Sequence, residues 1–182
     1  MKKFLLFLIL SLLISCSRKE KPQPETQSLT TPQIFDLVKI ENSPHPEKAP
    51  NFYWRTNDAE ISLYEILKNK VILVNFWATW CGPCVKEIPD LIKIQEELGG
   101  QNFEIIGISI DRSISPVLEF TKNAKINYTI IHDPEAKLLE AFGGSIGIPT
   151  TYLIDRDGKI VNKYVGARTK EVFANDIKKI LK

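Results

Sequence analysis

The sequence predicts an α/β protein with a mixed central β-sheet flanked by helices. Short, nearly continuous apolar segments, typical of strands buried on both faces, alternate along the chain with segments whose apolar residues repeat at helical spacing. The last two apolar segments, however, are joined only by Arg156-Asp157-Gly158, a sequence typical of an antiparallel hairpin. Because this hairpin adds antiparallel pairing to an otherwise alternating pattern, the sheet is expected to be mixed.

The first fifteen residues are predicted to be an export signal and not part of the fold. Lys2 and Lys3 precede an apolar run over residues 4–14 that only Ser11 interrupts. Eleven helical residues at 1.5 Å each cover roughly half of a hydrocarbon core that is about 30 Å thick. This length fits the apolar region of a signal peptide and is short for a permanent membrane span.

The end of this run, Leu13-Ile14-Ser15-Cys16, resembles the lipobox of bacterial lipoproteins. The resemblance implies that the signal is cut before Cys16 and that the Cys16 thiol then carries diacylglycerol, which anchors the mature chain to a membrane. An ordinary signal peptide with a chance cysteine is the alternative. The small residue before Cys16 and the polar, proline-containing stretch after it favour the lipobox.

Residues 16–48 are predicted to be a flexible tether that holds a domain away from the membrane. Five prolines interrupt regular structure there, namely Pro22, Pro24, Pro32, Pro44 and Pro46. The apolar spacing of residues 33–40 leaves a short helix as an alternative. His45 lies between two of the prolines and is expected to be a solvated tether residue, not a metal ligand.

One domain is expected over residues 49–182, and about 134 residues are enough for a single core. The predicted strands are residues 52–55, 71–77, 103–110, 128–132, 150–155 and 159–165. The predicted helices are residues 63–68, 83–98, 116–124, 134–142 and 170–181. Ser115 and Thr169 are the expected caps of the third and fifth helices, while glycine pairs end the second and fourth. In the last helix, the residues expected to face inward are Val172, Phe173, Ile177, Ile180 and Leu181.

Composition and charge exclude several classes of protein. Hydrophobic residues make up 43% of the 182 residues, which excludes wholesale disorder. The chain has 24 basic and 22 acidic side chains, and removal of residues 1–15 leaves 22 of each, so no nucleic-acid partner is expected. Three cysteines are too few for a disulfide-rich scaffold. Because their number is odd, one cysteine must stand apart, and we interpret it as Cys16, which leaves the other two as a pair.

That pair, Cys81 and Cys84, lies where a buried strand is expected to meet a helix. At a helix N-terminus, free N–H groups and the helix dipole stabilise negative charge, so Cys81 is expected to be a thiolate that attacks disulfides. Cys84 lies one turn further on the same side, where it can attack the mixed disulfide and release the substrate. Pro83 is tolerated between them because it falls in the first helical turn.

Other uses of the two cysteines are less consistent with the sequence. A zinc site needs two more ligands, but Cys16 is expected to be lipidated and the two histidines are scattered, so no metal is expected. A c-type haem site would need a histidine directly after Cys84, where Val85 stands. A static structural disulfide remains an alternative, although a stabilising disulfide that closes so tight a loop at a strand–helix junction would be unusual.

Two motifs far apart in the sequence, residues 75–84 (NFWATWCGPC) and residues 147–155 (GIPTTYLID), resemble the thioredoxin superfamily. More narrowly, they resemble the membrane-tethered TlpA/ResA-like thiol–disulfide oxidoreductases, over residues 49–182. The resemblance implies a thioredoxin fold with an N-terminal extension. It also implies a central helix–strand–helix insertion at residues 111–142, which we expect to tune the choice of partner, with extra core as the alternative.

The resemblance also implies a substrate-binding surface around the cysteines. Pro149 matches a cis proline that lies beside them, and the backbone there can pair with a substrate segment, which Ile148 would touch. Trp80, Gly82 and Pro83 are expected to shape the rest of this surface. No cofactor is expected beyond the redox-active disulfide of Cys81 and Cys84.

One departure concerns proton transfer. Thioredoxin has a buried aspartate beneath the cysteines, but this sequence has Asn75, which cannot accept a proton. Glu87 lies three residues after Cys84, on the same helical face, and the resemblance associates a glutamate there with the active site. If Glu87 is partly buried, its pKa rises and it can act as an acid or base; the alternative is a solvent-exposed glutamate.

Together these features predict an exported, lipid-anchored oxidoreductase in the cell envelope, with its domain facing the periplasm or the cell exterior. The dipeptide Gly82-Pro83 between the cysteines is that of thioredoxin, which favours reduction of disulfides. Expected partners are exported proteins with disulfides or thiols, apocytochrome c among them, and a membrane protein that donates electrons by thiol relay. A peroxiredoxin-like thiol peroxidase and a non-enzymatic copper-binding assembly factor are the alternatives. The spacing around Cys81 and the position of His132 match neither well.

Overall fold

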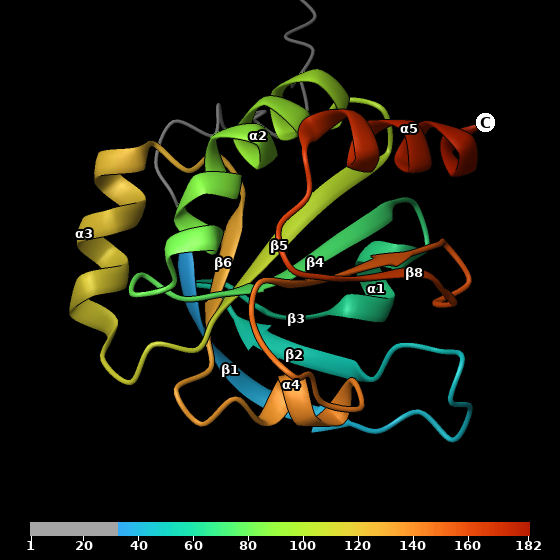
Figure 1. The fold of residues 1–182 in the computed structure, drawn as a ribbon. Helices are drawn as coiled ribbons and strands as arrows, with labels where there is room; N and C mark the ends of the chain where they lie inside the picture. Colours follow the sequence, from blue (N-terminus) through green and yellow to red (C-terminus); the bar gives the residue numbers. More distant parts are fainter. Residues whose placement is uncertain (1–32) are drawn as a thin grey trace, which may run out of the picture.

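The computed structural model describes residues 33–182, which form an α/β fold around one sheet of eight strands (Figure 1). The strands are β1 (Ile34–Glu41), β2 (Asn51–Arg55), β3 (Glu60–Ser62), β4 (Val71–Trp77), β5 (Phe103–Ser109), β6 (Thr129–His132), β7 (Thr150–Ile154) and β8 (Ile160–Val165). The helices are α1 (Leu63–Leu67), α2 (Gly82–Leu98), α3 (Ile114–Ala124), α4 (Lys137–Ala141) and α5 (Lys170–Leu181). The expected signal peptide, the lipidation site Cys16 and the first half of the expected tether lie outside the described residues. Within residues 33–182, no helix is both long enough and apolar enough to cross a membrane.

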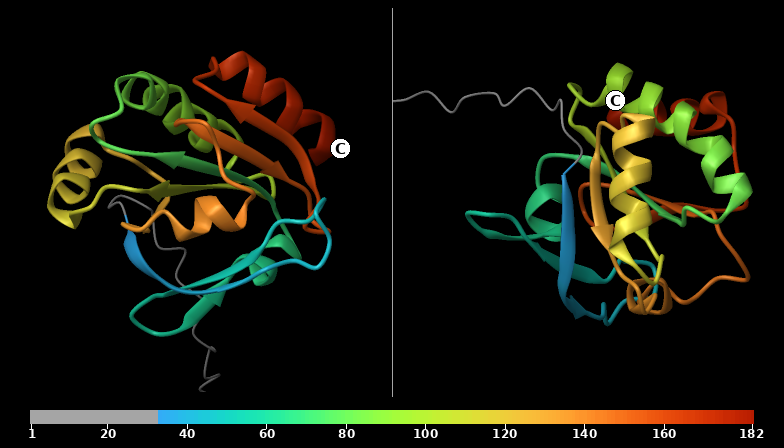
Figure 2. Two further views of the ribbon diagram at one scale, coloured as in Figure 1. Left: turned by 60° about the horizontal axis from the view of Figure 1, so that its bottom comes forward. Right: turned by 90° about the vertical axis from the view of Figure 1, so that its left-hand side faces the viewer.

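The sheet is mixed, as the sequence predicts, in the order β3-β2-β1-β6-β5-β4-β7-β8. Strands β1, β6, β5 and β4 run parallel to one another. At one end of this parallel group β2 pairs antiparallel with β1, and β3 with β2; at the other end β7 pairs antiparallel with β4, and β8 with β7. All seven residues of β4 are buried, which explains why this strand is apolar almost throughout. The sheet curls strongly, so that β2 and β3 lie well below β7 and β8 in the left-hand view of Figure 2.

Helices cover both faces of the sheet, and the sheet separates the core into two clusters. Helices α2 and α5 lie on one face, with α3 beside α2, and α1 and α4 lie on the other (Figures 1 and 2). The cluster under α2 includes Leu91, Phe103 and Phe173, while Phe52, Phe76 and Leu138 belong to the opposite cluster. The insertion at residues 111–142 therefore supplies α3 to one face and α4 to the other, with β6 between them in the sheet.

The expectation of a flexible tether over residues 16–48 is wrong for Ile34–Glu41. Strand β1 (Ile34–Glu41) pairs antiparallel with β2 and parallel with β6, so it lies inside the sheet. The short helix considered for residues 33–40 is equally wrong. Ile34, Val38 and Ile40 are β-branched residues compatible with a strand, and pairing with β2 and β6, which both lie further along the chain, stabilises it.

Several boundaries also differ from the sequence predictions. The cap of α3 is Ser113, not Ser115, which places Pro116 in the first helical turn, where its missing N–H is tolerated. Helix α4 begins only at Lys137, and the three-residue strand β3 was not predicted. Val172 is 38% exposed and does not face inward, because the buried stripe of α5 is formed by Phe173, Ala174 and Ile177.

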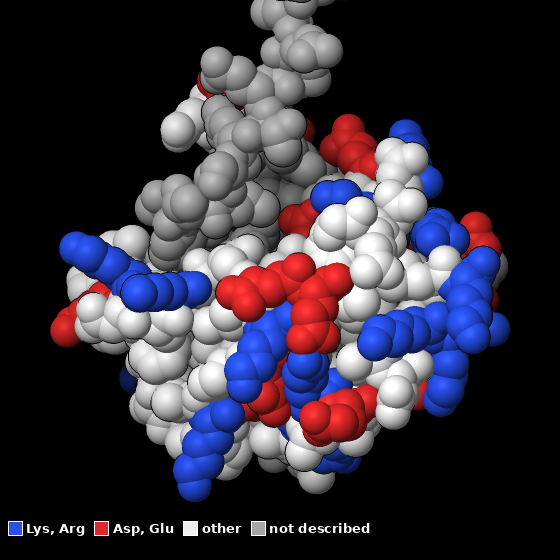
Figure 3. Space-filling view, turned by 90° about the horizontal axis from the view of Figure 1, so that it is seen from above, with Lys and Arg blue, Asp and Glu red and all other residues white. Residues whose placement is uncertain are grey.

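The face seen in Figure 3 carries acidic and basic side chains close to one another, without a large field of one sign. Ion pairs join Lys170 to Glu97, between α5 and α2, and Lys93 to Asp90 within α2. Such exposed pairs contribute little to stability, typically below about 1 kcal/mol each.

Candidate active site

The two cysteines lie at the amino end of α2, directly after the turn that follows β4. Cys81 is the N-cap of α2, and its Sγ accepts a hydrogen bond from the backbone N–H of Cys84 at 3.2 Å. Gly82 and Pro83 form the exposed first turn of the helix between them. This arrangement directs free N–H groups and the positive end of the helix dipole at the Cys81 sulfur, which stabilises a thiolate there when the pair is reduced.

Cys81 and Cys84 are joined by a disulfide, with their Cα atoms 5.2 Å apart. Cys81 is 6% exposed and Cys84 only 1%. The outer sulfur therefore belongs to Cys81, which is the one that another molecule can reach, and Cys84 is shielded behind it.

The loop before β7 lies against the outer cysteine. The Ile148–Pro149 peptide bond is cis, as the resemblance implies, and the Ile148 carbonyl oxygen lies 3.6 Å from Cys81 Sγ. Pro149 is buried, whereas Ile148 is partly exposed. The structure thus brings together two motifs that are 67 residues apart in the sequence.

Glu87, which lies on α2 three residues after Cys84, is buried, and this answers the question that the sequence left open about its environment. Its side chain is 3% exposed. Oε1 accepts a hydrogen bond from Asn75 Nδ2 at 3.0 Å, and Oε2 accepts one from the backbone N–H of Arg168 at 2.6 Å. Burial raises the pKa of Glu87 to about 7, although these two hydrogen bonds oppose the shift. A carboxyl group with such a pKa can both take and give a proton near neutral pH.

A second buried carboxylate, Asp111, holds the turn that leads to the cysteines. Asp111 is 3% exposed and follows β5 at the sheet edge where β4 also ends. It accepts hydrogen bonds from the backbone N–H of Thr79 at 3.0 Å, the Thr79 hydroxyl at 2.6 Å and the Ser109 hydroxyl at 2.9 Å. Thr79 lies two residues before Cys81, so Asp111 fixes the approach to the helix start.

Two exposed apolar side chains belong to the segments that meet at the outer cysteine. Trp80, directly before Cys81, is 68% exposed, and Ile146, in the loop that leads to Ile148, is 98% exposed. Exposed apolar residues are normal when scattered, but these two belong to the two segments that meet at Cys81.

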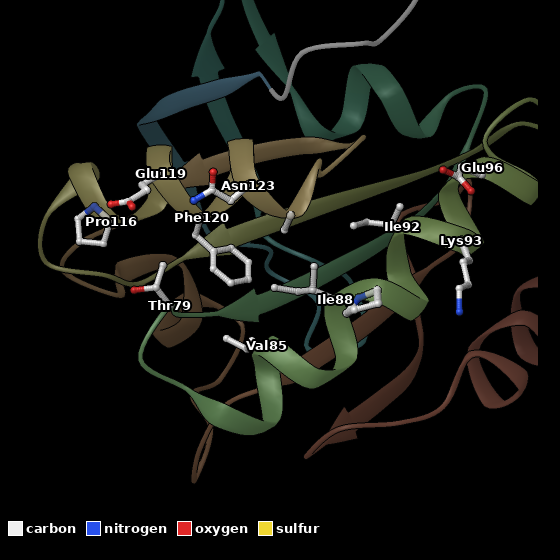
Figure 4. A pocket seen from close by; sticks show the side chains of 12 residues that line it. Thr79, Val85, Ile88, Ile92, Lys93, Glu96, Pro116, Glu119, Phe120 and Asn123 are labelled. Carbon is white, nitrogen blue, oxygen red and sulfur yellow. The ribbon is translucent and has the colours of Figure 1, made fainter.

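An apolar groove lies between α2 and α3 and begins at the turn before Cys81 (Figure 4). Its volume is about 770 Å³. Phe120 from α3 and Ile88 from α2 point into it from opposite sides, and Thr79 and Val85 lie at the end nearest the cysteines. Lys93, Glu96 and Glu119 supply its charged edges. The groove exists because the insertion places α3 beside α2.

The alternative of a copper site depends on His132. Its Nε2 lies 2.8 Å from the Asp111 carbonyl oxygen, and it is on β6, which β5 separates from β4. Within residues 33–182, no group of three or more histidine, cysteine, aspartate and glutamate side chains could hold a metal ion.

Sequence reasoning identified both cysteines, Glu87 and the Ile148–Pro149 loop, but missed Asp111, Thr151 and Arg168. Asp111 had a usable signal, since polar residues that follow neighbouring parallel strands gather at one sheet edge. Thr151, whose hydroxyl lies 2.8 Å from Asn75 Nδ2, had no signal beyond its place beside the cis proline. Arg168 contributes its backbone N–H to Glu87, and the type of its side chain gives no indication of that contact.

Comparisons with known proteins agree with this geometry. A sequence profile described as Redoxin matches residues 45–181. The chain is 34% identical to "Thiol-disulfide oxidoreductase ResA" of Bacillus cereus, over 98% of each chain. A thiol:disulfide interchange protein of the thioredoxin family from Chlorobium tepidum has a similar structure, with a TM-score of 0.67 and 34% identity over 77% of this chain and 99% of that one. The thioredoxin domain of a Bacteroides vulgatus thiol-disulfide oxidoreductase gives a TM-score of 0.64 at 26% identity, over 80% and 100% of the two chains.

Proposed function

Because the chain belongs to the Redoxin family and is a thiol–disulfide oxidoreductase of the TlpA/ResA-like group in the thioredoxin superfamily, we propose that it reduces disulfides in exported proteins. The observation that carries the proposal is the Cys81–Cys84 disulfide, with Cys81 the more exposed cysteine and Glu87 buried on the same helix three residues after Cys84. Cys81 is the nucleophile, Cys84 resolves the mixed disulfide, and Glu87 serves as the proton acceptor.

The reaction starts from the reduced pair. The Cys81 thiolate attacks one sulfur of the substrate disulfide, which forms a mixed disulfide and releases the other substrate sulfur as a thiolate. Glu87 then takes the proton of the Cys84 thiol, and the Cys84 thiolate attacks Cys81 Sγ. The second substrate sulfur leaves as a thiolate, and both substrate thiolates take up protons. The substrate has gained two electrons, and the pair ends as the disulfide present in this structure.

The substrate-binding surface is formed by the segments around Cys81. The backbone next to Ile148 and Pro149 offers pairing to an extended substrate segment. Trp80 and Ile146 contact the residues that flank the substrate disulfide. Gly82 and Pro83, which are both exposed, form the part of this surface that directly follows Cys81.

The groove between α2 and α3 extends this surface on the side of Thr79. A protein whose disulfide reaches Cys81 must also cover the adjacent surface, and the groove offers apolar walls to an apolar side chain close to the substrate cysteine. The insertion would thereby influence which proteins are reduced, since it supplies Phe120 and the rest of the α3 wall.

The cell envelope is the proposed location. Cys16 carries the lipid anchor, the domain faces the periplasm or the cell exterior, and a membrane protein returns two electrons to the disulfide by thiol exchange. Disulfides form in such compartments, so a reductant there has substrates. Apocytochrome c is one proposed substrate.

A trapping experiment tests the proposal. A Cys84→Ser variant, expressed in cells of the source organism, lacks the resolving thiol and should accumulate proteins bound to Cys81 by mixed disulfides. The matched control is the double variant Cys81→Ser, Cys84→Ser, which should capture none. Absence of thiol-linked proteins, while Cys81 still reacts with an alkylating reagent, would refute protein disulfide exchange.

A redox titration tests the direction. A midpoint near that of thioredoxin, about −270 mV, agrees with a reductase. A midpoint near about −120 mV, typical of a strong oxidant, contradicts it.

A further inference from the structure

Asn75 links Glu87 to the sheet interior by a chain of three buried polar side chains. Its Nδ2 donates to Glu87 Oε1 at 3.0 Å and to Thr151 Oγ1 at 2.8 Å. Asn75 and Thr151 are each 1% exposed and Glu87 is 3% exposed. Little water reaches these groups, so the protein itself must supply hydrogen-bond partners for every state of the carboxyl group.

The ionised form of Glu87 is well matched to this arrangement. Both carboxylate oxygens face N–H donors, one from Asn75 and one from the backbone of Arg168. Neither donor needs to move, and each hydrogen bond to the charged group is stronger than one to a neutral group.

The protonated form of Glu87 does not fit these two N–H donors. A proton on Oε2 would face the Arg168 backbone N–H, which is a donor fixed by the loop between β8 and α5 and cannot turn. The proton must therefore lie on Oε1. There it faces Asn75 Nδ2, which is also a donor, so one of the two donors would have no acceptor.

An asparagine can remove this conflict, because its amide has a donor on one side and an acceptor on the other. A half-turn of the amide presents Oδ1 to Glu87, where it accepts the carboxyl proton. Oδ1 then also faces Thr151, whose hydroxyl rotates freely enough to donate instead of accept. No other group in the chain of three needs to move.

We propose that Asn75 is a positioning residue whose side-chain amide reverses, together with the Thr151 hydroxyl, each time Glu87 gains or loses a proton. The inference rests on the proposed role of Glu87 in disulfide exchange. The reversal gives each oxygen of the buried Glu87 carboxyl group a hydrogen-bond partner in both protonation states, so that proton transfer with Cys84 does not leave this group unpaired.

The charged and titratable groups around Glu87 do not offer an alternative partner for the proton. Arg168 favours the ionised form, Asp90 on α2 opposes it, and the Tyr128 hydroxyl is near enough to be influenced by the Glu87 charge. Among the described residues, however, only Asn75 and the Arg168 backbone N–H are hydrogen-bonded to the carboxyl oxygens.

Neutron diffraction on the oxidised protein tests this inference, because deuterium positions distinguish the nitrogen of an amide from its oxygen. Crystals at pH 9 should show the Asn75 deuterons directed at Glu87 and Thr151. Crystals at pH 5 should show Oδ1 in that place, with deuterons on Glu87 Oε1 and Thr151 Oγ1. The same amide orientation at both pH values, or a Glu87 that keeps one protonation state, would overturn the inference.

Titration in solution provides the second readout. The ¹⁵N resonance of the Asn75 side chain should shift with the same midpoint as the Glu87 carboxyl carbon, and it should stop shifting in a Glu87→Gln variant. A Thr151→Val variant keeps the shape of the side chain but loses the hydroxyl, and should lose the wild-type response. A Thr151→Ser variant, which keeps the hydroxyl, should show the wild-type response. An Asn75 resonance that does not follow Glu87 would overturn the inference, and the trapping experiment judges the proposed function separately.

Discussion

Glu87 and Asp111 are two equally buried carboxyl groups close to the cysteines in sequence or by contact. Glu87 lies on α2, three residues after Cys84, and Asp111 is hydrogen-bonded to Thr79, two residues before Cys81. Each is 3% exposed, yet their partners differ in kind. Asp111 accepts from one backbone N–H and two hydroxyls, whereas Glu87 accepts from two N–H groups. Burial raises the pKa of Glu87 to about 7.

The comparison shows that burial alone does not decide what a carboxylate does. Three donors from β5 and the Thr79 turn converge on Asp111, and this geometry holds the turn in place. Glu87 has fewer donors, and its burial is only partly offset, so its two protonation states are nearly balanced at neutral pH. Asp111 holds the turn before Cys81, whereas Glu87 is suited to the proton transfer that we propose.

The largest expected effect comes from removing the carboxylate that holds the turn. An Asp111→Ala variant leaves the Thr79 N–H and two hydroxyls without their acceptor, which should lower the free energy of unfolding by about 4 kcal/mol. Urea denaturation measures this loss. Asp111→Asn, which keeps one acceptor oxygen, should lose clearly less, and an equal loss in both variants would contradict the hydrogen-bond explanation.

The next effect concerns the pH dependence of stability that Glu87 imposes. Its folded pKa of about 7 lies above the ordinary value of 4.5, so the folded state holds this proton more tightly than the unfolded state. The associated stability is fully present below about pH 4.5 and is lost as pH rises towards 7, by a total of about 3 kcal/mol.

A Glu87→Gln variant removes this loss. Relative to the wild-type protein, the variant should gain about 3 kcal/mol of stability between pH 4 and pH 8, measured by urea denaturation of the oxidised form. Glu96→Gln, an exposed change on the same helix, is the matched control and should follow the wild-type curve. A constant difference between Glu87→Gln and wild type at all pH values would show that Glu87 does not titrate in this range.

The smallest expected effect tests whether the groove between α2 and α3, on the Thr79 side, binds the substrate without affecting the chemistry on the Glu87 side. An Ile92→Ser variant removes apolar surface from the groove and should raise KM for a protein disulfide about fivefold, equivalent to about 1 kcal/mol. The rate with a small aromatic disulfide, which does not reach the groove, should not change. Leu118→Ser on α3, which is 50% exposed and does not line the groove, is the control. Equal losses with both substrates would exclude a docking role.

Short-range patterns allowed most of the fold to be predicted. Strand β4 has the bounds expected from its continuous apolar residues, and α2 follows from its apolar stripe and the glycines at its end. Strand β1 could not be predicted in the same way. Its residues favour a strand only weakly, and what stabilises it is pairing with β2 and β6, which lie about 15 and 95 residues further along the chain.

The sequence by itself determined the reactive pair, because a CxxC spacing at a strand–helix junction places both sulfurs within one helical turn. That is local geometry, and no distant residue is needed to produce it. Only the tertiary structure decided the state of Glu87. Its partners are the Arg168 N–H, 81 residues away, and Asn75, which is itself bound to Thr151 across 76 residues. Burial and hydrogen bonding are properties of the assembled core, so the protonation of this carboxyl group depends on contacts that no single segment contains.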